Sequence, residues 1–117
     1  MSELQLETIP VDDHCALIRV AGILDAQTFE QLDETLNRLM DGGTNRIAVD
    51  LRGLDQVSAA GAGVFIGTHA ILKERGGALV LSDLAQPVRE LFDLLGLPEI
   101  LAIAATSDEA VRLAQGK

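Results

Sequence analysis

The strongest candidate for a functional site in this chain is the segment Val57-Ser58-Ala59-Ala60-Gly61, because it lies where a helix is expected to begin. The free N–H groups and positive dipole end of a helix start attract phosphate or carboxylate groups. Serine is also a preferred N-cap residue, worth about 1 kcal/mol of stability. The segment therefore has two interpretations. Either Ser58 is simply the cap of the helix, or the segment is a hydroxyl-bearing loop that another protein recognises.

The glycines that follow resemble a nucleotide-binding motif, but their spacing disfavours a nucleotide site. A dinucleotide motif places its glycines directly after a strand, whereas about ten residues separate Leu51 from Gly61. A phosphate loop of the Walker type also needs Lys followed by Ser or Thr, and this run lacks them. We interpret the small residues of this run as letting the helix lie close to a sheet; they are Ala60, Gly61, Ala62, Gly63 and Gly67. Phe65 is interpreted as a core residue.

Other reactive side chains have no partners at useful spacing. His14 and His69 stand alone, which favours structural roles. A single cysteine, Cys15, excludes an internal disulfide and is expected to be a small buried hydrophobe. The acidic residues are expected on polar faces and helix starts, at Asp33, Glu34, Asp83, Glu90, Asp93, Asp108 and Glu109. We therefore predict no catalytic residue, no cofactor and no metal site.

Charge and hydropathy narrow the class of protein further. The 117 residues carry 18 acidic and 9 basic side chains, for a net charge of −9, which argues against nucleic acid and anionic membranes as partners. No apolar run approaches the roughly 20 residues of a membrane span. The N-terminal sequence lacks the features of a signal peptide. The expectation is a cytoplasmic protein without membrane insertion.

Apolar runs alternate with helical patterns along the chain. Five strands are predicted, at 4–7, 15–20, 47–51, 78–81 and 100–103, with a loop through Gly53 and Asp55. The predicted helices are one capped by Asp25 and stopped at Gly42-Gly43, one over 60–75, one from Pro87 to Gly96, and one after the capping box Thr106–Glu109. This order predicts one α/β domain over 1–117, with a mixed, mostly parallel sheet of about five strands, about four helices, and an antiparallel opening pair.

In order and spacing, these segments resemble the STAS domain family, of the anti-sigma-factor antagonist type, nearly from end to end. The loop and helix start over 57–64 resembles the family pattern D-S-S-G-L-G. The resemblance extends over Gly22-Ile23-Leu24-Asp25, 49–54, 76–81, 88–92 and 95–97.

The resemblance implies a binding module rather than an enzyme. Family members bind an anti-sigma factor that is also a serine kinase of the histidine-kinase-like ATPase type, and a phosphatase is a further expected partner. Phosphorylation of a serine at this helix start breaks the contact. By the same resemblance, the partner-binding residues are Asp25, Ser58, Ala59, Gly61 and Ala62.

This chain departs from the family at the phosphoacceptor. The acceptor position aligns with Ala59, which has no hydroxyl, and Ser58 stands where many relatives have Asp. Either Ala59 is a natural replacement, or it was introduced by engineering, or Ser58 has taken over the role. We favour the first two, because a shift of one residue at a helix start turns the side chain by about 100°.

Two other functions stay open at this point. A STAS domain can be a scaffold subunit of a signalling assembly, or the small cytoplasmic subunit of a lipid-transport ATPase. From a different class, a nucleotide-binding protein or small enzyme would use the helix start as an anion site. The partner's identity and the oligomeric state are not predicted.

Overall fold

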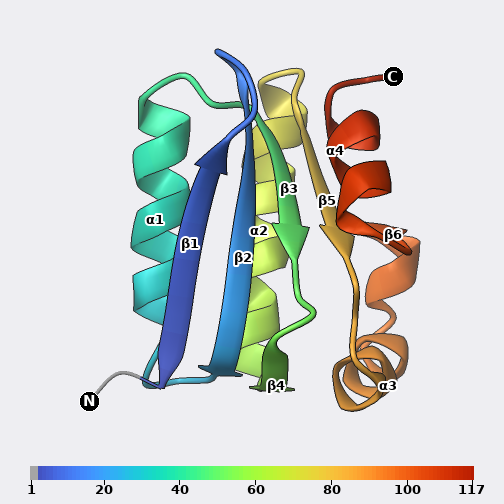
Figure 1. Ribbon diagram of the computed structural model, residues 1–117. Coiled ribbons are helices and arrows are strands. Elements are labelled where there is room, and N and C mark those ends of the chain that lie inside the picture. Colours follow the sequence, from blue (N-terminus) through green and yellow to red (C-terminus); the bar gives the residue numbers. More distant parts are fainter. Residues whose placement is uncertain (1–2) are drawn as a thin grey trace.

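A mixed six-stranded sheet runs through the computed structural model, which describes residues 3–117 (Figure 1). Its strands are β1 (Leu4–Pro10), β2 (Cys15–Leu24), β3 (Arg46–Asp50), β4 (Leu54–Val57), β5 (Ala78–Ser82) and β6 (Ala102–Ala104). The helices are α1 (Phe29–Asp41), α2 (Ala59–Glu74), α3 (Gln86–Leu94), α4 (Ser107–Ala114) and the short 3-10 helix η1 (Leu97–Glu99). The expected domain limits, 1–117, include residues 1–2, which lie outside the described range.

The sheet topology confirms the predicted fold class. The strand order is β1-β2-β3-β5-β6, and β4 pairs with β2 beside this path. β1 is antiparallel to β2, whereas the pairs β2–β3, β2–β4, β3–β5 and β5–β6 are parallel. The carboxyl ends of β2, β3 and β5 therefore meet at one end of the molecule, where α2 and α3 begin (Figure 1).

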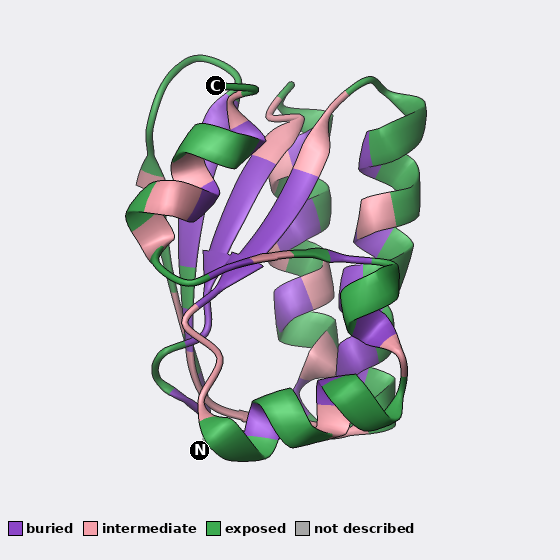
Figure 2. Cartoon of the chain, turned by 90° about the vertical axis from the view of Figure 1, so that its right-hand side faces the viewer, coloured by how far each residue is buried: buried purple, intermediate pink, exposed green. Residues whose placement is uncertain are grey.

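Two layers of helices enclose the sheet. α1, α2 and α3 cover one face and α4 covers part of the other, so the strands form the buried middle layer in Figure 2. The larger core fills the three-helix side and includes Phe65 and Phe92, whose rings meet edge to face with centroids 6.3 Å apart. Under α4 the core is built of smaller side chains, among them Cys15, Ala48, Val80, Ala110 and Ala114. The two cores follow from strand residues pointing alternately to opposite faces.

β4 is the main difference from the predicted elements, since the loop expected through Gly53 and Asp55 contains this strand. β3 ends at Asp50, which pairs with Arg19, while β2 continues for five more residues. β4 takes the place of β3 as the neighbour of this extension, pairing at Gly22, Ile23 and Leu24. The sheet therefore has six strands where about five were predicted, because the four residues of β4, without a clear alternation, give no strand signal.

The end of the sheet also differs from the prediction. The last strand was expected at 100–103, but β6 occupies Ala102–Ala104. Gly96, at φ 72°, ends α3 and turns the chain into η1, which holds Pro98. The apolar residues Ile100 and Leu101 belong to this corner rather than to the strand. The apolar run therefore starts two residues before the strand does, which is why the predicted strand began too early.

α2 is the longest helix, with 16 residues, and it is apolar on nearly all sides. Its buried side includes Val64, Phe65 and Leu72, and its exposed side includes Ile66, which is 38% exposed. Within the described part of the chain, no helix combines the length and hydropathy needed to cross a membrane.

Candidate functional site

The start of α2 is tied to the end of β2 by backbone hydrogen bonds. β4 ends at Val57, which pairs with Leu24, the last residue of β2. Ser58 N–H then donates to the Leu24 carbonyl at 2.9 Å. The loop that carries the predicted recognition residues is therefore a continuation of the sheet.

Ser58 is the N-cap of α2, as one of the two interpretations predicted. Its backbone is extended, at φ −96° and ψ 170°, and its Oγ accepts a hydrogen bond from Gly61 N–H at 3.2 Å. Its carbonyl accepts from Ala62 N–H at 2.9 Å. The side chain is half-buried. The hydroxyl is thus engaged with the backbone of its own helix.

Gly61 lets the first turn of α2 lie against β2. A Cβ at this position would lie 2.7 Å from both Cγ and the carbonyl oxygen of Leu24. The interpretation of the small residues as close-packing residues is therefore confirmed for Gly61, and Ala62 is also buried, at 1% exposure. It was wrong for Ala60, Gly63 and Gly67, which are exposed. A Cβ added at Gly63 or Gly67 would meet no described neighbour within 4 Å.

Ala59 is the first residue of α2 and is exposed, as is Ala60. No acidic side chain lies in the first turn of α2, so the positive end of its dipole is not offset from within the helix. Of the five residues predicted to bind a partner, Ala59 is exposed, Asp25 and Ser58 are half-buried, and Gly61 and Ala62 are buried. The buried pair therefore supports the helix start from inside.

Asp25 directly follows Leu24, so the end of β2 places it beside the α2 start. The structure corrects its expected role as the α1 cap, because the N-cap of α1 is Thr28. Asp25 Oδ1 instead accepts hydrogen bonds from Gln27 N–H at 2.8 Å and Thr28 N–H at 3.2 Å. Thr28 Oγ1 donates to the Ile23 carbonyl at 2.8 Å. Asp25 thus closes a turn before α1, and the helix is capped three residues later than the prediction had it, at Thr28.

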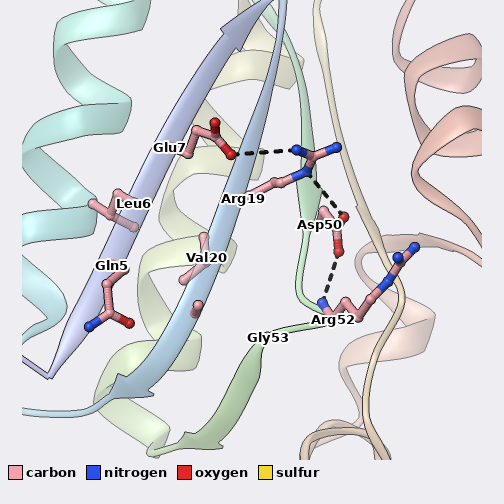
Figure 3. Close-up of a pocket in the computed structure, with 9 residues that line it drawn as sticks. Gln5, Leu6, Glu7, Arg19, Val20, Asp50, Arg52 and Gly53 are labelled. Atoms are coloured by element: carbon pink, nitrogen blue, oxygen red, sulfur yellow. Dashed lines mark hydrogen bonds and ion pairs between the residues drawn. The ribbon is translucent and has the colours of Figure 1, made fainter.

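A hollow of about 410 Å³ lies on the sheet face that α4 leaves open (Figure 3). Its charged groups are already paired, since Arg19 lies 3.4 Å from Glu7 and 3.7 Å from Asp50. The Asp50 side chain is only 7% exposed, and its Oδ1 accepts from Arg52 N–H at 2.8 Å. Sequence reasoning missed this cluster; a charged residue within the apolar run 15–20 was its only signal. The cluster joins β1, β2 and the end of β3, and its charged groups are engaged with one another rather than offered to a ligand.

The remaining candidates lie away from the α2 start. His14 is exposed in the turn between β1 and β2, and His69 is half-buried on α2. Among residues 3–117, no three potential metal-ligating side chains come together. Phe65 is fully buried, as predicted.

Cys15 is buried beneath α4 at 1% exposure, as predicted, and this burial raises the pKa of its thiol above the usual 9.0. Unfolding exposes a thiol of ordinary pKa, which ionises first as the pH rises. Stability linked to Cys15 is therefore complete below about pH 9 and should fall above it.

We expect native Cys15 to react with iodoacetamide far more slowly than the same residue in urea, with intact-mass spectra recording the alkylation. Cys15→Ala, which has no thiol, controls for labelling elsewhere and should remove the thiol's part of the alkaline stability loss. Equal labelling rates with and without urea would contradict the burial.

The chain is similar to known proteins in both sequence and structure. A family model described as "Mlab, STAS domain" matches residues 8–102. The anti-sigma-B factor antagonist of Bacillus subtilis (strain 168) is 33% identical over 95 residues, covering 81% of this chain and 86% of that protein. The anti-sigma factor antagonist SpoIIAA in its unphosphorylated form has a similar structure, with a TM-score of 0.80, 26% identity and 97% of each chain covered. The Bacillus cell fate determinant SpoIIAA in its phosphorylated form gives a TM-score of 0.70 at 23% identity, covering 94% of this chain and 98% of that one.

Proposed function

The chain belongs to the STAS domain family, of the anti-sigma-factor antagonist type, and on that premise we propose that it binds and sequesters an anti-sigma factor in a partner-switching pathway. The proposed partner is a serine kinase of the histidine-kinase-like ATPase type, and the chain itself has no enzymatic role. The names of the similar proteins support the general role, and one of them is known in a phosphorylated form.

The observation that carries the proposal is the exposed, uncharged start of α2. Ala59 and Ala60 are exposed, while Gly61 and Ser58 fix the backbone beneath them. We propose Asp25, Ser58 and Ala59 as contact residues, with Gly61 and Ala62 as their support. A helix start whose exposed side chains are only the methyl groups of Ala59 and Ala60 lets another protein approach closely, and binding it costs little side-chain entropy.

Ala59 at the acceptor position makes this chain a permanently competent binder in the proposal. Ser58 is a poor substitute, because its Oγ already accepts from Gly61 N–H and its side chain is half-buried. A phosphate added at the helix start would bring a charge of about −1.5 to −2 into the contact surface. The unmodified chain therefore stays bound when a serine-bearing relative would be released.

The function is tested by calorimetric titration of the chain with each purified ATPase-type anti-sigma factor of its source organism, with ATP or ADP present. Saturable binding to one of them is the expected result. If none binds, the proposed function is wrong. A phosphatase is a secondary proposed partner, relevant only to a chain that can carry phosphate.

Ala59→Ser should convert the chain into a substrate of that anti-sigma factor. The new hydroxyl would stand on the exposed first residue of α2, so incubation with the factor and ATP should add one phosphate to the intact mass. The unsubstituted chain is the control and should keep its mass. Phosphate on Ser58 of the unsubstituted chain would contradict the assignment of Ala59 as the acceptor position.

The lack of a hydroxyl at Ala59 also favours a second function. A chain without an acceptor hydroxyl also suits a permanent scaffold subunit, either of a signalling assembly or of a lipid-transport ATPase, and the matching family model names Mlab. Co-purification with a membrane transporter ATPase, with no affinity for anti-sigma factors, would establish this alternative. A nucleotide-binding protein is the weaker third candidate, which calorimetry of the chain with ATP and GTP tests directly.

A further inference from the structure

A second hollow lies at the edge of the sheet beyond β5. It encloses about 390 Å³ and is lined mostly by apolar groups of the segment Gly77–Val80, with Ala102 and Leu113. β6 has only three residues and pairs with β5 from Val80 onward, so the first two residues of β5 have no β6 residue beside them. The groove occupies the space that a longer edge strand would fill.

α2 and α4 form the walls of this edge groove. Figure 2 looks onto this side of the molecule, with the buried strands between α4 and the opposite helical layer. Leu113 of α4 is 45% exposed. His69 and Lys73 of α2 line the opposite wall, and because they are four residues apart they lie on the same helix face. An apolar groove of this volume with a few converging polar groups has the composition of a small-molecule site.

The polar side chains that line the groove are the cationic Lys73 and the basic His69. Neither Lys73 nor His69 has a side-chain hydrogen bond or ion pair with any of the residues 3–117. The hollow of Figure 3 differs in this respect, because its arginines are already paired with carboxylates. A free ammonium group beside an apolar groove is complementary to a ligand with an anionic head and an apolar body.

We propose that this edge groove binds a small amphipathic carboxylate, with the carboxylate at Lys73 and His69 and the hydrocarbon chain along β5 between Ala102 and Leu113. The site is separate from the α2 start, since Lys73 lies at the opposite end of the helix. The ligand is a free straight-chain acid, and the proposal does not depend on which partner binds Ala59.

The test is calorimetric titration with the sodium salts of hexanoate, octanoate and decanoate below their micelle concentrations. Each added methylene should tighten binding about fourfold until the groove is full, since burying a CH₂ contributes about 0.8 kcal/mol. The alcohols of the same length should bind more weakly. Amide chemical-shift changes should centre on residues 77–80 and 102.

Two substitutions separate the parts of the site. Lys73→Gln should weaken carboxylate binding about two- to fivefold, as expected for an exposed ion pair, and leave the affinity for the alcohols unchanged. Ala102→Leu should fill the groove and weaken binding of every ligand at least about tenfold. Arg89→Gln, which removes an exposed cation outside the groove, is the matched control and should change nothing.

Affinity that does not depend on chain length, or shift changes outside the groove, would overturn the proposal. So would an unchanged affinity in Ala102→Leu with its native spectrum retained. Binding to anionic phospholipid vesicles without binding to the free acids would assign the groove to a membrane surface instead.

Discussion

Ala59→Glu should lower the affinity for the anti-sigma factor by at least about 100-fold, because a charge on the exposed helix start enters the proposed contact without a partner. The substituted chain should fold at least as well as the original. α2 has no acidic residue in its first turn, and a carboxylate there favours the helix dipole by about 0.3–1 kcal/mol. Binding and stability are thus expected to change in opposite directions, which separates a lost contact from lost folding.

The matched control is Ala70→Glu, which makes the same substitution at a position of the same helix that is not buried and lies away from its start. Calorimetry with the purified anti-sigma factor should give this variant an unchanged affinity. If Ala59→Glu binds as tightly as the original chain, the α2 start is not the contact surface. A loss of binding shared equally by both variants would instead attribute the effect to net charge.

Gly61→Ala should destabilise the fold by about 2–3 kcal/mol, the upper range for overpacking at a position that cannot relax. The added Cβ would lie 2.7 Å from the Leu24 carbonyl oxygen, an atom fixed by its hydrogen bond from Ser58. Urea unfolding followed by circular dichroism measures the change in the free energy of unfolding.

Gly63→Ala is the matched control and should have the opposite sign. Gly63 lies in the same helix two residues later and is exposed, and a Cβ added there would meet no described neighbour within 4 Å. Alanine should stabilise the chain there by about 0.5–1 kcal/mol through helix propensity alone. Equal effects at the two glycines would contradict the close contact between α2 and β2.

Helices and buried strands of this protein were predictable because their patterns are local. Pro87 and the Thr106 cap identified α3 and α4 correctly, and Thr106 Oγ1 accepts from Glu109 N–H at 3.2 Å. β4 was missed because its strand character comes from the extension of β2, which is distant in sequence. Asp25 was misassigned for a related reason, since both a turn and a helix cap use a carboxylate to accept backbone N–H groups.

The position of the candidate site along the chain could be predicted, but the exposure of its side chains could not. The sequence motif groups Ser58 to Ala62 without saying which side chains face the sheet. Only the contact with Leu24 shows that Gly61 faces inward, whereas Ala59 faces solvent. The edge groove could not be predicted at all, because it results from the shortness of β6 and from two helices distant in sequence.

The hydrogen bond from Ser58 to Leu24 also restricts the loop that we propose as the contact surface. Because Ser58 N–H is bonded to the carbonyl of the last residue of β2, and Val57 pairs with the same residue, the loop opens only when β4 detaches from β2. We therefore expect local opening there to be coupled to loss of the β2–β4 pairing rather than to fluctuation of the loop alone. We therefore expect the proposed partner to dock onto a preformed surface and to select it by shape, without folding of the loop on contact.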